Sequence, residues 1–262
     1  MRGDQTAAPD AIANRDTMPA MSDPERQELI EPIERALAIF SHPDDAEFGA
    51  AATIASLVGR GARVDYVVTT DGGKGTDDPS VTSEQLAATR IAEQRAAADV
   101  LGVAEIVHLD YPDGYLEPTL DLRRDIVRQL RRLRPQLVIA QNPQRRMDGN
   151  PFIGHPDHLA TGEATLSAVY PAARDRLNFP ELLDDGLEPW KVRQVLVTGA
   201  ERPNLWVDVG AHLDTALAAL RCHASQIDDW DAVEQRVRDR AREAGEPVGL
   251  PAAQAFLSIL LD

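Results

Sequence analysis

Cysteine is nearly absent from this sequence, which contains Cys222 alone. One chain therefore has no disulfide framework, and nothing in its composition indicates an oxidising compartment. The sequence also lacks an apolar run long enough to span a membrane. Basic residues are scarce, because 27 lysines and arginines stand against 43 acidic residues and give a formal net charge of −16. A surface this acidic argues against nucleic acid and anionic membranes as partners, and it suits a cytoplasmic protein.

The N-terminal segment is polar and lacks the apolar central stretch of a signal peptide. Its richness in alanine, aspartate and proline predicts a disordered leader over residues 1–30. Residues 31–262 contain no internal repeat and no obvious interdomain linker, and their number fits a single domain. The sequence leaves a homo-oligomer open.

Short apolar runs alternate with longer amphipathic segments from residue 36 onward. The short runs predict strands at 36–40, 64–70, 106–109, 137–140, 195–197 and 205–209. The longer segments predict helices at 45–60, 83–101, 120–133, 155–170, 213–222 and 231–244. This alternation predicts an α/β, Rossmann-like fold, in which a mostly parallel sheet has helices on both faces. Such sheets bind ligands at the carboxyl ends of their strands.

Two histidine-containing turns stand at the carboxyl ends of predicted strands. The first is Ser41-His42-Pro43-Asp44-Asp45, directly after the first strand, and the second is His155-Pro156-Asp157-His158, beyond the fourth. A single turn of this kind is often only a helix cap, whereas two at equivalent positions favour a functional site. No Gly-x-Gly-x-x-Gly fingerprint follows the first strand, which disfavours a non-catalytic nucleotide- or sugar-binding module.

The residue types in these turns suit metal chemistry. His42 and Asp45 are three residues apart, so both side chains project to one side of a helix start. An imidazole and a carboxylate are ordinary zinc ligands, and a catalytic zinc needs a third protein ligand. Either His155 or His158 can supply it. Asp44 points elsewhere and is free to act as a base on a water molecule.

Together the two turns resemble the motifs of the LmbE-like, or PIG-L-type, de-N-acetylase family. Further segments are similar to other parts of that family: Thr70–Gly75, Arg90–Gly102, Tyr111–Gly114, Arg134–Val138 and Leu217–Gln226. The resemblance implies a zinc cofactor, with Fe²⁺ as an alternative ion. It also implies hydrolysis of an N-acetyl group on an N-acetylglucosamine-like amino-sugar conjugate, with release of acetate. An amidase of the same family acting on a thiol conjugate or an antibiotic-pathway intermediate stays open.

The resemblance further implies roles for individual residues. The metal ligands that it implies are His42, Asp45 and His158. The general base would be Asp44. His155 would stabilise the oxyanion or act as an acid, with Asp157 orienting it.

Four more residues are candidate substrate contacts: Lys74, Arg90, His223 and Gln226. Lys74 stands in a loop where the family frequently has glutamate or arginine. An exposed helix face is an equally good interpretation for Arg90, as is a structural role for His223. Ala46 separates the aspartate pair from Glu47, whereas the commonest family form has glutamate immediately after the pair, so the role of Glu47 is left open.

Overall fold

Strands and helices alternate from residue 35 to residue 167, as the sequence pattern predicts, in a computed structural model that describes residues 25–145 and 153–262. The strands are β1 (Arg35–Phe40), β2 (Arg63–Thr70), β3 (Glu105–Tyr111), β4 (Leu137–Ala140), β5 (Gln194–Thr198), β6 (Leu205–Asp208) and β7 (Ala253–Leu260). The helices are α1 (Asp45–Gly59), α2 (Ser83–Leu101), α3 (Leu120–Leu133), α4 (Pro156–Ser167), α5 (Glu181–Asp184), α6 (Leu213–Leu220) and α7 (Trp230–Gly245). Among the described residues, none of these helices has the length and apolar character that a membrane span requires.

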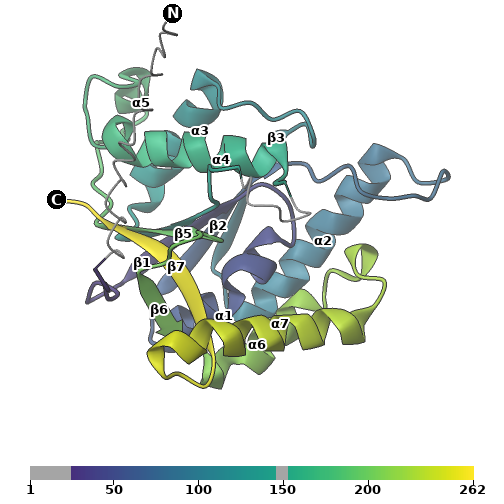
Figure 1. The fold of residues 1–262 in the computed structure, drawn as a ribbon. Coiled ribbons are helices and arrows are strands. Elements are labelled where there is room, and N and C mark those ends of the chain that lie inside the picture. Colours follow the sequence, from purple (N-terminus) through teal and green to yellow (C-terminus); the bar gives the residue numbers. More distant parts are fainter. Residues whose placement is uncertain (1–24, 146–152) are drawn as a thin grey trace, which may run out of the picture.

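The strands of the described ranges form a seven-stranded sheet in the order β3-β2-β1-β4-β5-β7-β6. The strands from β3 to β5 in this order are parallel, whereas β7 runs antiparallel to both β5 and β6. Helices α3 and α4 cover one face of the sheet, and α1, α2, α6 and α7 cover the other (Figure 1). The predicted mostly parallel sheet with helices on both faces is therefore confirmed.

Strand β1 lies inside the sheet, and its position explains why residues 36–40 are all apolar. Leu37 and Ile39 belong to the core beneath α3 and α4, whereas Ala36, Ala38 and Phe40 face the core beneath α1 and α2. Successive side chains of a strand point to opposite faces of the sheet. A strand buried on both faces must therefore be apolar at every position.

Strand β7 was not predicted from the sequence pattern, yet it inserts between β5 and β6. Its register pairs Ile259 with Val195 of β5 and Phe256 with Leu205 of β6. Small and polar residues interrupt its apolar positions, so its local pattern is weak. Its conformation depends on two partner strands that are distant in sequence, and local propensity does not encode such pairing.

Most of the predicted leader, residues 1–24 of 1–30, lies outside the described residues. Residues 25–30 are described, and they contact the domain. The Gln27 N–H donates to the Asn204 carbonyl at 2.7 Å, and the Ile30 N–H donates to Gln194 Oε1 at 3.0 Å. Leu29 packs against the core. Hydrogen bonds to residues of the sheet and its loops thus connect this part of the leader to the domain, and the disordered leader stays a prediction.

The strand order places a crevice between β1 and β4. The chain runs outward from β1 to β2 and β3 on one side, and through β4 to β5 on the other. At such a switch point the loops after the two central strands diverge, which leaves room for a ligand at their carboxyl ends. The two histidine turns follow these two strands, at the start of α1 and at the start of α4.

Helix α4 approaches the end of β4 closely at Gly162. A Cβ atom at this position would lie 2.6 Å from the Gln141 carbonyl oxygen and 2.8 Å from the Pro143 nitrogen. Because these are backbone atoms, Gly162→Ala should destabilise the protein by about 1–3 kcal/mol. Chemical denaturation measures this loss. The exposed neighbour offers a control, since Glu163→Ala should change the free energy of unfolding by less than about 0.5 kcal/mol. Equal effects of the two substitutions would contradict the close approach.

Candidate metal centre and active site

The crevice brings three potential ligand atoms from the two turns together. His42 Nδ1 lies 3.2 Å from His158 Nε2. Asp45 Oδ2 lies 3.2 Å from His42 Nδ1, and the other carboxylate oxygen, Asp45 Oδ1, lies 3.1 Å from His158 Nε2. Tetrahedral zinc with nitrogen and oxygen ligands at about 2.1 Å holds those ligand atoms about 3.4 Å apart. The spacing and the donor types therefore fit one divalent cation.

Gln141, the first residue after β4, connects the two central strand ends at this site. Its Nε2 donates to Asp45 Oδ2 at 3.0 Å. Its Oε1 accepts the Ser41 N–H at 3.0 Å and the Ser41 hydroxyl at 2.6 Å. Gln141 had no predicted role, because its partners lie about 100 residues away in the sequence. It fixes one carboxylate oxygen of Asp45 against the end of β1.

The second ring nitrogen of His42 faces two carboxylates. Its Nε2 lies 3.1 Å from Asp157 Oδ2 and 3.1 Å from Asp113 Oδ1. Metal-binding imidazoles usually donate their other N–H to a carboxylate, which fixes the tautomer and the ring orientation. The geometry therefore matches a His42 that binds a cation through Nδ1. Asp113 had no predicted role, although it follows the third strand just as His42 follows the first.

The Asp157 carboxylate is placed differently from the role that the resemblance implied. Asp157 Oδ1 lies 3.9 Å from His155 Nδ1, beyond hydrogen-bond distance, and the carboxylate instead orients His42. It also accepts the Gly114 N–H at 2.7 Å and the Leu116 N–H at 3.2 Å. His155 is oriented by the Asp157 backbone, whose N–H donates to His155 Nδ1 at 3.2 Å. This contact leaves the proton of a neutral His155 ring on Nε2.

The electrostatics of the cluster favour bound positive charge. Burial acts to lower the pKa of the His42 imidazole. Three carboxylates that hydrogen-bond to the ring outweigh burial and raise this pKa to about 12: Asp113, Asp157 and Asp45. Several buried carboxylates this close to one another require a compensating positive charge. A divalent ion at the three ligand atoms would supply that charge in place of a proton.

Asp44 stands beside the ligand atoms but makes no contact with them. Its backbone has φ 103°, in the left-handed region that non-glycine residues rarely adopt, at a cost of about 1–3 kcal/mol. Its Oδ2 lies 3.4 Å from Arg90 Nη2. Burial and the neighbouring Asp45 charge raise the pKa of Asp44 to about 7, and a nearby cation would act to lower this pKa. The strained backbone directs the Asp44 side chain into the same cavity as the ligands.

Arg90 is buried rather than exposed on the surface of α2, so the interpretation as an exposed helix face is wrong. Its guanidinium donates to the carbonyl of Pro43 at 2.8 Å, of Gly72 at 3.1 Å and of Lys74 at 3.0 Å. Arg90 therefore connects the loop after β1 to the loop after β2. Its planar fork of donors suits this set of carbonyls, and lysine would not replace it.

A cavity of about 330 Å³ opens over the cluster. Its lining residues come from the segments that follow β1, β2, β3 and β4, from α2 and from the segment after α6: His42, Asp44, Asp45, Phe48, Lys74, Gly75, Arg90, Asp113, His155, His158 and Gln226. Three of the four predicted substrate contacts therefore face it. His223 does not, because its side chain is fully buried and its Nε2 lies 3.1 Å from Glu47 Oε2. The structural interpretation of His223 fits this position, and a direct substrate contact does not.

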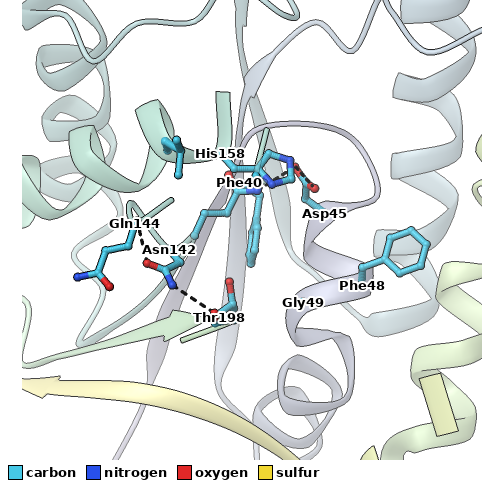
Figure 2. A pocket seen from close by; sticks show the side chains of 12 residues that line it. Phe40, Asp45, Phe48, Gly49, Asn142, Gln144, His158 and Thr198 are labelled. Atoms are coloured by element: carbon cyan, nitrogen blue, oxygen red, sulfur yellow. Dashed lines mark hydrogen bonds and ion pairs between the residues drawn. The ribbon is translucent and has the colours of Figure 1, made fainter. Parts of the chain in front are cut away.

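A second hollow of about 320 Å³ adjoins the first and shares Asp45, Phe48 and His158 with it. Figure 2 shows Asp45 and His158 at one end of this hollow and Asn142 and Thr198 at the other. Asn142 is held by its own contacts, since its Nδ2 donates to the Gly199 carbonyl at 3.2 Å. The two hollows meet at Asp45 and His158, two of the three candidate ligands. A substrate larger than one sugar therefore has room on both sides of the cluster.

Comparisons with known proteins agree with this geometry. The family model described as GlcNAc-PI de-N-acetylase (PIG-L) matches residues 37–169. Diacetylchitobiose deacetylase of Thermococcus kodakarensis is 34% identical over 219 residues, covering 83% of this chain and 80% of that protein. A 1D-myo-inositol 2-acetamido-2-deoxy-alpha-D-glucopyranoside deacetylase of Thermobispora bispora is 27% identical, covering 78% and 83% respectively.

The solved structures include a protein of similar fold and similar size. N,N'-diacetylchitobiose deacetylase from Pyrococcus horikoshii, in complex with its inhibitor MPG, superposes with a TM-score of 0.81 at 32% identity. The match covers 87% of this chain and 84% of that one. The resemblance first indicated by the two histidine turns is confirmed, and the chain belongs to the PIG-L, or LmbE-like, family of de-N-acetylases.

Proposed function

We propose that this protein is a metal-dependent amidase that removes the acetyl group from an N-acetylglucosamine-like amino-sugar conjugate. The observation that supports it most directly is the convergence of His42, Asp45 and His158 within 3.2 Å, in a cavity that Asp44 also lines. The named relatives that deacetylate diacetylchitobiose and an inositol-linked acetamido sugar support the substrate class.

The three converging residues would hold the metal ion. Two imidazoles and one carboxylate suit Zn²⁺, and the same donors accept Fe²⁺. The bound ion would act as a Lewis acid that polarises the amide carbonyl and lowers the pKa of a water molecule. Asp157 and Asp113 would keep the His42 ring in the tautomer with its proton on Nε2.

Asp44 would transfer the proton, and His155 would stabilise the negative charge that develops on the carbonyl oxygen. Asp44 takes a proton from the water whose oxygen attacks the acetamide carbon. His155 lines the cavity, and the Nε2–H of its neutral ring would donate a hydrogen bond to the carbonyl oxygen as that oxygen becomes negative. Asp44 then passes the proton to the leaving nitrogen as the C–N bond breaks. The products are acetate and a free amine.

Lys74, Arg90 and Gln226 border the cavity where the sugar would lie. Lys74 Nζ stands 4.7 Å above the Tyr115 ring centroid, which holds its ammonium group near the cavity rim. Polar groups at fixed positions can pair with sugar hydroxyls and so select for them. The remainder of the conjugate has the second hollow available.

A hydrolysis screen tests the proposal. The zinc-loaded protein should release acetate from N-acetylglucosamine conjugates. For a simple N-alkylacetamide, kcat/KM should be lower by a factor of at least about 10³, because that substrate lacks the sugar hydroxyls. Released acetate is quantified for disaccharide, inositol, thiol-conjugate and antibiotic-aglycone substrates. The same screen with chelated protein is the control. Absence of acetate release from every amino sugar, with full metal occupancy, would contradict the proposed function.

A further inference from the structure

The side chain of Gln94, on α2, connects the backbone of Asp44 to a buried carboxylate. Gln94 Oε1 accepts the Asp44 N–H at 3.1 Å. Gln94 Nε2 donates to both carboxylate oxygens of Glu47 at 3.1 Å each. The side chain is fully buried and does not line the cavity over the ligand cluster. Its hydrogen bond to the Asp44 backbone connects it to that cavity.

The chemistry of its neighbours fixes the orientation of the Gln94 amide. The Asp44 N–H can only donate, and an ionised Glu47 carboxylate can only accept. Rotating the amide by 180° would oppose donor to donor and acceptor to acceptor. The observed orientation is thus the one that satisfies all the groups, and the carboxylate of Glu47 determines it.

Glu47 is in turn held by groups from two other elements. The Tyr66 hydroxyl, from β2, donates to Glu47 Oε1 at 3.2 Å. His223 Nε2, beyond the end of α6, lies 3.1 Å from Glu47 Oε2. Tyr66, His223 and Glu47 are all at most 4% exposed. Buried polar groups paired in this way form a rigid network, because breaking any contact leaves an unpaired group in a medium of low polarity.

The Asp44 backbone needs such support. Its φ of 103° is unfavourable for a residue with a Cβ, so the peptide would relax if nothing held it. Arg90 holds the preceding carbonyl, of Pro43, while Gln94 holds the Asp44 N–H. The direction of the Asp44 side chain follows from this backbone conformation.

We propose that Gln94, with its amide fixed by Glu47 and His223, is a positioning residue that holds Asp44 in the conformation required of the general base. The inference rests on the proposed function, since it assigns Asp44 the role of base. It gives Glu47 and His223 a shared role: they fix the Gln94 amide that holds the Asp44 backbone, and they do not contact the substrate.

Gln94→Leu keeps a similar volume and removes all three hydrogen bonds. We expect it to lower kcat about 10²-fold, as a displacement of about 1 Å in a reacting group does, with KM and metal content nearly unchanged. The decisive measurement is a double-mutant cycle with Asp44→Asn. If Gln94 acts through Asp44, the double variant should be no slower than Asp44→Asn alone, because the two effects are not additive. A further loss of about 10²-fold in the double variant would overturn the proposal, as would full kcat in Gln94→Leu.

A second variant and a structural measurement extend the test to cases where activity is lost or the leucine variant does not fold. Glu47→Gln replaces one of the two acceptor oxygens that orient the Gln94 amide with a donor, and it should lower kcat in the same Asp44-dependent way. In a crystal structure of either variant, Asp44 should leave the left-handed region, and an unchanged φ would overturn the proposal even without an assay. Gln129→Leu, at a buried glutamine of α3 on the opposite face of the sheet, is the matched control and should keep kcat.

If the wild-type protein does not hydrolyse acetamido sugars, the proposed function fails, while the crystal structures still decide whether Gln94 holds the backbone. If the wild type is active and Gln94→Leu has the same kcat, the proposed role of Gln94 is wrong and the proposed function still stands.

Discussion

Asp44→Asn is expected to retain its metal ion and to lose activity by about 10²–10⁴-fold in kcat, which is the usual contribution of a general base. Asparagine keeps the size of the side chain and tolerates the left-handed backbone as well as aspartate does. The substitution therefore removes the proton acceptor without relaxing the strained turn at φ 103°. Steady-state kinetics and elemental analysis of the purified variant measure the two parts of this prediction.

An exposed aspartate provides the control for that substitution. Asp99→Asn, near the end of α2, makes the same chemical change on the surface and should leave kcat within twofold or so. Substantial turnover by the Asp44 variant would remove Asp44 from the mechanism. A variant that lost both turnover and metal would instead show that Asp44 contributes to the binding of the ion.

Removing the metal ion should abolish hydrolysis and also lower the midpoint of thermal unfolding. The two losses have one cause, because the carboxylates around His42 then face a single imidazolium charge in place of a divalent ion. An ion that binds only the folded state stabilises it by mass action. We expect Zn²⁺ or Fe²⁺ to restore both properties. Activity, unfolding midpoint and bound metal are measured before chelation, after chelation and after each ion is returned.

Magnesium is the informative control for reconstitution. It prefers six oxygen ligands and binds imidazole poorly, so it should restore neither activity nor stability at comparable concentration. Hydrolysis that persists at full rate in protein shown to be metal-free would refute the metal-dependent mechanism. Restoration by magnesium alone would require a different ligand set from His42, Asp45 and His158.

The candidate ligands were predictable because they stand in short motifs at places that the strand pattern defines. A buried strand followed by His42 and Asp45 already places an imidazole and a carboxylate at the edge of a parallel sheet. His158 could be joined to them because the second motif follows another predicted strand. The structure brings these atoms to within 3.2 Å, as the hypothesis of a shared ion requires.

Residues that act through a single long-range hydrogen bond could not be found in this way. Gln94, Asp113 and Gln141 stand in no motif of their own that defines a partner, and each is ordinary for its local element. Asp157 belonged to a recognised motif, yet its partner proved to be His42, 115 residues earlier, rather than His155. Distances between such groups depend on how strands and helices pack, and sequence spacing does not encode them.

The sequence by itself determined the alternation of strands and helices, the positions of the two histidine turns and the types of ligand they offer. These follow from hydrophobic periodicity and side-chain chemistry, which are local properties. Only the tertiary structure decided that β7 lies between β5 and β6, that Arg90 and His223 are buried, and that Gln94 contacts both Asp44 and Glu47. Those outcomes depend on which distant groups share a low-dielectric interior, where each polar atom must find a partner that folding alone provides.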